Sequence, residues 1–75
     1  MVFDKCKQIV ADQMGIDPES ITMDSKLIED IGADSLDTVE ILLNIENEFG
    51  IELEDGVVEN FTTFKDVVEY VESLI

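Results

Sequence analysis

The sequence contains no histidine, no arginine and no tryptophan, and it has a single cysteine, Cys6. Without histidine, the chain cannot build a serine–histidine catalytic triad or a histidine-ligated metal site, and one cysteine cannot form a multi-cysteine metal centre. Cys6 also cannot form a disulfide within the chain, which is typical of a reducing compartment. Because Cys6 lies on the apolar face of a predicted helix, we expect it to be a small core residue rather than a reactive thiol.

Basic residues are also scarce. Four lysines stand against 19 acidic residues, which gives a net charge of −15. This charge excludes nucleic acid and anionic membranes as favourable partners and favours basic protein surfaces. No apolar run is long enough to cross a membrane, and the start of the chain does not resemble a signal peptide, so we expect a cytoplasmic protein without membrane insertion. The carboxylates follow polar helix faces, which predicts an acidic surface and no specific metal site.

The length of 75 residues and the hydrophobic content of 45% indicate one folded domain that spans residues 1–75. Apolar residues repeat with helical spacing in three stretches, and none of the sequence reads as a reliable strand. The sequence therefore predicts an all-α fold, a small four-helix bundle with three longer helices, one short helix and a long first loop. The predicted helices are residues 2–14, 35–49 and 64–74, with the short one at 55–60, and the first loop is 15–34 with one helical turn near Pro18.

The ends of these helices carry their own signals. Gly15 and Gly50 should end the first two, Asp55 or Glu54 should cap the short one, and Thr63 and Asp66 form a capping box before the last. The last helix should bury the side that holds Phe64, Val67, Val68, Val71 and Leu74. The apolar residues of the first loop should pack onto the core; they are Ile16, Ile21, Leu27, Ile28 and Ile31.

The predicted helix 35–49 has two apolar faces. Ile41, Leu42 and Ile45 lie on the side that also holds Thr38 and Phe49, and this side should face the core. A small domain with one core cannot easily bury the opposite side as well. That side forms a strip of Leu36, Val39 and Leu43, ringed by Asp34, Asp37, Glu40 and Glu46. An apolar strip with an acidic rim is typical of a helix that docks on other proteins. The alternative is that the strip packs under the long loop.

The start of this helix is the candidate site. Gly32 lets the chain bend, Asp34 is a good N-cap, and Asp37 follows three residues later, as in a capping box. If these two carboxylates cap the helix, the hydroxyl of Ser35 is left free in the first turn, beside backbone N–H groups that suit a phosphate. We therefore hypothesise that Ser35 carries a phosphodiester-linked prosthetic group.

The run from Glu29 to Glu40, EDIGADSLDTVE, resembles the signature of acyl carrier proteins, in particular the free-standing carriers of bacterial type II fatty acid synthesis. The length, the acidity and the positions of Phe49 and Thr62-Thr63 extend the resemblance over the whole chain. The resemblance implies a four-helix bundle that is a carrier and not an enzyme. It also implies that a phosphopantetheinyl transferase attaches 4′-phosphopantetheine from coenzyme A to Ser35, and that the arm carries growing fatty acyl chains as thioesters.

The resemblance further implies that fatty acid synthesis enzymes grip the helix after the serine and the short third helix through their basic patches, and that the chain acts as a monomer. By position, the docking residues would be Asp34, Leu36, Asp37, Val39, Glu40, Leu43, Glu46, Leu53, Asp55 and Glu59. Two alternatives stay open. The chain could carry another cargo, as polyketide, nonribosomal peptide or D-alanine carriers do, or it could be an unmodified acidic helical adaptor.

Overall fold

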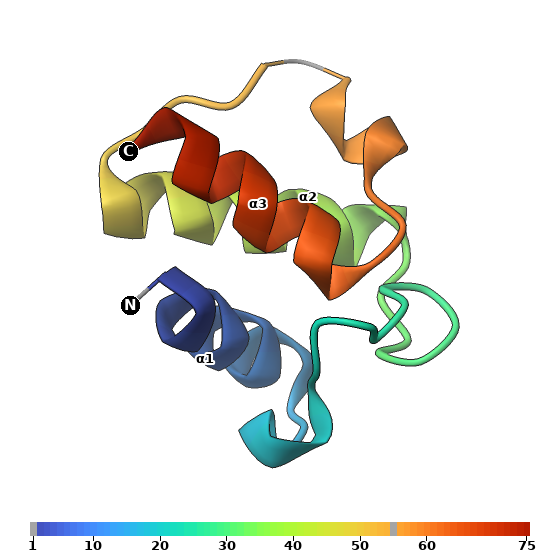
Figure 1. Cartoon of the computed structure of the whole chain (residues 1–75). Coiled ribbons are helices and arrows are strands. Elements are labelled where there is room, and N and C mark those ends of the chain that lie inside the picture. Colours follow the sequence, from blue (N-terminus) through green and yellow to red (C-terminus); the bar gives the residue numbers. More distant parts are fainter. Residues whose placement is uncertain (1, 55) are drawn as a thin grey trace.

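The computed structural model describes residues 2–54 and 56–75, and of Val58 only the main chain. The described chain forms three α-helices and two short 3₁₀ helices, with α1 in contact with both other α-helices (Figure 1). It holds no strand, only an isolated bridge between Lys26 and Thr63. The elements are α1 (Val2–Met14), η1 (Pro18–Ser20), α2 (Ser35–Phe49), η2 (Val57–Asn60) and α3 (Phe64–Leu74). The predicted all-α fold with a long first loop is confirmed.

Apolar side chains from all three α-helices and from the first loop form the core. The members of this core are Cys6, Val10, Ala11, Ile21, Leu27, Ile31, Ala33, Ile41, Leu42, Ile45, Phe64, Val67, Val68 and Val71. The core-facing side predicted for residues 35–49 is confirmed, since it supplies Ile41, Leu42 and Ile45. Leu74, predicted on the buried side of α3, is instead 42% exposed, because the buried part of that helix ends at Val71.

The second half of the first loop is fixed by main-chain hydrogen bonds. The carbonyl of Lys26 accepts from the N–H groups of Asp30 (2.9 Å) and Ile31 (3.0 Å). The resulting turn buries Leu27 and Ile31 and leaves the three residues between them exposed. Ile28 is 71% exposed, so the prediction that it packs onto the core is wrong. The turn closes at Gly32, whose φ of 84° favours glycine, and the chain then enters α2.

The short third helix differs from the predicted one. It is a 3₁₀ helix over Val57–Asn60 instead of a helix that starts at residue 55. Gly56, predicted inside the helix, precedes it with a φ of 81°. The N–H of Val57 donates to the main-chain carbonyl of Glu54 (3.3 Å), and the proposed capping by Asp55 lies outside the described residues. A stretch of four residues is typical of a single 3₁₀ turn and too short for a regular α-helix.

Candidate functional site

A complete capping box begins α2. The Asp34 carboxylate accepts a hydrogen bond from the N–H of Asp37 (2.9 Å), and the Asp37 carboxylate accepts one from the N–H of Asp34 (3.2 Å). The hydroxyl of Thr38 donates to the Asp34 carbonyl (2.9 Å). The predicted capping box is therefore confirmed, and it satisfies the helix start without any contribution from Ser35.

Ser35 is the first residue of α2 and is exposed. Its hydroxyl makes no hydrogen bond with any described residue. Beside it lies a hollow of about 260 Å³ whose lining is mostly apolar. The lining residues are Leu27, Ile28, Ser35, Thr38, Val39, Glu59 and Phe61. An accessible alcohol thus stands at the electropositive end of a helix, next to an apolar recess, which suits the attachment of a phosphate-linked group.

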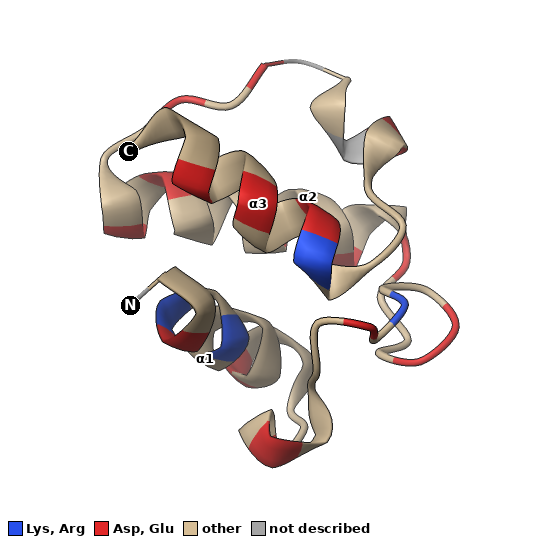
Figure 2. Cartoon of the chain, in the orientation of Figure 1, with Lys and Arg blue, Asp and Glu red and all other residues tan. Residues whose placement is uncertain are grey.

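The apolar strip of α2 lies at the surface. Leu36 is 66% exposed, Val39 44% and Leu43 53%. This confirms the predicted exposed strip and excludes the alternative that it packs under the first loop. The helix also carries Asp37, Glu40, Glu46 and Glu48 and no lysine. In Figure 2 the basic residues lie in α1, the first loop and the start of α3.

The structure brings six of the predicted docking residues together at the start and along the outer side of α2. They are Asp34, Leu36, Asp37, Val39, Glu40 and Leu43, and all but Asp37, which is half-buried, are exposed. Glu59 lies in η2 and lines the hollow beside Ser35, and Asp55 lies outside the described residues. The carboxylate of Glu40 accepts a hydrogen bond from the side-chain amide of Gln13 in α1 (2.7 Å). Sequence reasoning missed Gln13 because the two residues are 27 positions apart, and no local pattern connects them.

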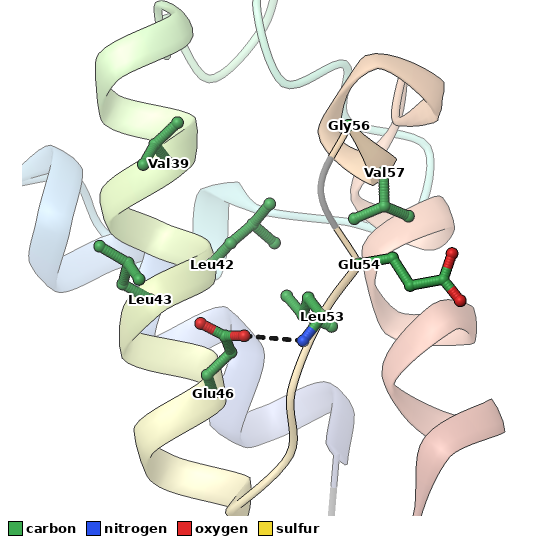
Figure 3. Close-up of a pocket in the computed structure, with 8 residues that line it drawn as sticks. All are labelled: Val39, Leu42, Leu43, Glu46, Leu53, Glu54, Gly56 and Val57. Atoms are coloured by element: carbon green, nitrogen blue, oxygen red, sulfur yellow. Dashed lines mark hydrogen bonds between the residues drawn. The ribbon is translucent and has the colours of Figure 1, made fainter.

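A second hollow, of about 180 Å³, separates α2 from the chain that leads to η2. Val39, Leu42 and Leu43 line it from the helix, and Leu53 and Val57 line it from the other side (Figure 3). The carboxylate of Glu46 reaches across and accepts a hydrogen bond from the N–H of Leu53 (2.7 Å). Glu46 and Leu53, both predicted to dock on partners, are thus joined to each other.

Cys6 is fully buried in the core. Burial, together with the negative charge of Glu72, raises the pKa of the Cys6 thiol to about 11. The thiol is therefore protonated at neutral pH and unreactive, which confirms its predicted role as a core residue.

Comparisons with known proteins agree with this geometry. A family model described as phosphopantetheine attachment site matches residues 4–71, which defines the class of domain. The chain is 49% identical over 73 residues to the acyl carrier protein of Clostridium acetobutylicum, covering 97% of this chain and 95% of that protein. It is 45% identical over 73 residues to the acyl carrier protein of Campylobacter hominis, covering 97% of this chain and 92% of that protein.

The chain therefore belongs to the family of acyl carrier proteins. Members of this family are carriers and not enzymes, and they work with a covalently bound 4′-phosphopantetheine arm. None of the described helices has the length and apolar character needed to span a membrane.

Proposed function

We propose that Ser35 is the residue that carries the 4′-phosphopantetheine arm, and that the chain presents growing fatty acyl chains to the enzymes of fatty acid synthesis in the cytoplasm. The observation that carries this proposal is the free, exposed hydroxyl of Ser35 at the first position of α2. The carboxylates of Asp34 and Asp37 already cap the helix, so modification of Ser35 breaks no hydrogen bond among the described residues.

The residues around Ser35 fit such a group. The arm supplies a terminal thiol, which holds acyl groups as thioesters; the chain itself supplies the alcohol and the surroundings. Ile28 and Phe61 give the neighbouring hollow an apolar wall, while Thr38 and Glu59 add polar atoms. This mixture suits an arm that has both amide and methylene groups. Ile28, which is 71% exposed, thus adds to the apolar wall that buried Leu27 also lines.

Docking on partner enzymes, in this proposal, uses the exposed strip of Leu36, Val39 and Leu43 together with the carboxylates of Asp37 and Glu40. Apolar contacts at the centre and charges at the rim give moderate affinity and fast, charge-steered association with basic surfaces. The resemblance extends this surface to Asp34, Leu53, Asp55 and Glu59. The partners are a phosphopantetheinyl transferase and the fatty acid synthesis enzymes, each bound by a monomer of this chain.

The first test is modification by a broad-specificity phosphopantetheinyl transferase. Unmodified protein is incubated with coenzyme A, Mg²⁺ and the transferase, and the intact mass is measured. We expect the wild type to gain one phosphopantetheine group, Ser35→Ala to gain none, and the control Ser73→Ala, on exposed α3 surface, to react as the wild type does. A wild type that gains no mass would favour the acidic adaptor, and a gain that survives Ser35→Ala would assign the arm to another residue.

The second test measures docking. Glu40→Lys should raise the KM of the transferase for this protein roughly tenfold, with little change in kcat, because a rim charge mainly affects encounter. Glu69→Lys is the matched control, since Glu69 is also an exposed helical glutamate but lies on α3. Circular dichroism should show the same helix content in both variants. Equal KM values for the two variants would mean that net charge, and not the α2 surface, directs docking.

A further inference from the structure

Glu46 holds the chain that leaves α2 through both its side chain and its main chain. Its carboxylate accepts the N–H of Leu53 (2.7 Å), and its carbonyl accepts the N–H of Ile51 (3.2 Å) and that of Gly50, the C-cap of the helix. Figure 3 shows the Glu46 side chain extending from α2 across the edge of the hollow to the Leu53 nitrogen. Glu46, in the last turn of α2, thus accepts hydrogen bonds from the main-chain N–H groups of Gly50, Ile51 and Leu53.

The side-chain bond stands out because the segment from Ile51 to Glu54 has no regular secondary structure. Its other main-chain bonds, at Ile51 and at the carbonyl of Glu54, lie at its two ends. Between these ends, the bond from Leu53 to Glu46 is the hydrogen bond that joins the described segment to α2, and the Leu53 side chain also packs against the core. The bond to Glu46 is partly buried and its acceptor is a carboxylate oxygen, and both properties strengthen a hydrogen bond.

Leu53 and Val57 form the wall of the hollow that faces Val39, Leu42 and Leu43. Loss of the bond would leave side-chain packing to hold this wall against α2, and the main chain at Leu53 would move more. Glu40 provides a contrast: its carboxylate is exposed and contacts the flexible side chain of Gln13, so it constrains no main chain.

We propose that Glu46 is a positioning residue for docking and not a direct contact for partner cations. Its carboxylate holds Leu53, and with it η2, at a set distance from α2, so that the two parts of the docking surface are presented together. This inference rests on the proposed function, because it assumes that partners grip both α2 and η2. It differs from the role as a docking charge that the family resemblance implies for Glu46.

The test separates the hydrogen bond from the charge. Glu46→Gln removes the charge but keeps a side-chain oxygen that can accept from Leu53, whereas Glu46→Ala removes both. Hydrogen exchange of the Leu53 amide is followed by NMR, and the KM of the transferase is measured for each variant. In Glu46→Ala we expect exchange to accelerate roughly tenfold or more and KM to rise several-fold. Glu46→Gln should retain most of the protection and show the smaller rise in KM.

Glu40→Gln and Glu40→Ala are the matched controls on the same helix. A direct docking charge predicts that both raise KM equally and leave Leu53 exchange unchanged. If Glu46→Gln raises KM as much as Glu46→Ala while the Leu53 amide stays protected, Glu46 contacts the partner through its charge and the inference is overturned. The amide of Val10, in the core part of α1, reports whether a variant has lost global stability.

If Glu46→Ala does not fold, comparison of Glu46→Gln with Glu40→Gln still tests the positioning role. A positioning role predicts a smaller rise in KM for Glu46→Gln than for Glu40→Gln, and equal rises overturn it. The proposed function fails in a different way, because then the wild type itself gains no mass. A modified wild type combined with equal effects of the two Glu46 variants would refute this inference alone.

Discussion

Helices α2 and α3 begin with the same capping motif, but the residue that follows the cap has a different role in each helix. Each has a capping box, formed by Asp34 and Asp37 in α2 and by Thr63 and Asp66 in α3. The residue that follows the cap is exposed Ser35 in α2. In α3 the corresponding residue is Phe64, which is fully buried. The capping box therefore sets where a helix starts, while the surroundings decide whether that start serves stability or chemistry.

Residues of α1 and of the first loop cover the first turn of α3. The Phe64 ring packs edge-on against the ring of Phe3 from α1, with 5.6 Å between centroids. The first loop covers the backbone, since the carbonyls of Ser25 and Met23 accept from the N–H groups of Phe64 (2.8 Å) and Lys65 (3.0 Å). No comparable cover lies over Ser35 among the described residues, and its hydroxyl is free to be modified.

The largest expected effect follows from the buried start of α3. Phe64→Ala should lower the free energy of unfolding by about 3–5 kcal/mol, because it leaves a cavity in a small core. Leu36→Ala, which removes a 66% exposed side chain from the first turn of α2, should change it by less than about 0.5 kcal/mol. Urea denaturation followed by circular dichroism measures both values. Similar losses in the two variants would mean that the two helix starts do not differ in burial.

The next largest expected effect is the difference in stability cost between substitutions on the buried face and on the exposed face of α2. Ile45→Ala should cost about 2–5 kcal/mol, since Ile45 is fully buried. Leu43→Ala, two residues earlier on the exposed face, should cost less than about 1 kcal/mol and should instead raise the KM of the transferase. Unfolding curves and transferase kinetics on the same two proteins provide the measurement. A stable Ile45→Ala protein with impaired docking would reverse the assignment of the faces.

The smallest expected effect is the contribution of a capping-box carboxylate to the free energy of unfolding, which should depend on pH. Hydrogen bonds from the N–H groups of Thr63 (3.0 Å) and Thr62 (2.8 Å) hold the pKa of Asp66 below its ordinary value of 3.8. A lowered pKa in the folded state means that the Asp66 carboxylate contributes its full stability above that ordinary value and loses it as the pH falls through the folded pKa. Asp66→Asn should therefore cost about 0.5–1 kcal/mol near neutral pH, a modest figure because water surrounds this carboxylate.

Urea denaturation of the wild type and of Asp66→Asn at pH 6 and in strong acid measures this contribution. The difference between the two proteins should shrink in acid. Asp37→Asn is the control at α2, where the carboxylate accepts one longer bond, and it should cost less at pH 6. A difference between wild type and Asp66→Asn that does not depend on pH would show that the carboxylate charge does not stabilise α3.

By itself, the sequence determined the features that depend on neighbours along the chain. Capping boxes, helix ends at glycine and the two faces of α2 follow from spacings of two to four residues, and a free Ser35 follows from the capping roles of Asp34 and Asp37. Only the tertiary structure decided the exposure of Ile28, the 3₁₀ form of η2, and the bonds from Gln13 to Glu40 and from Leu53 to Glu46. These features depend on contacts between segments that are distant in the sequence and come together only in the folded chain. The spacing of neighbouring residues therefore does not predict them.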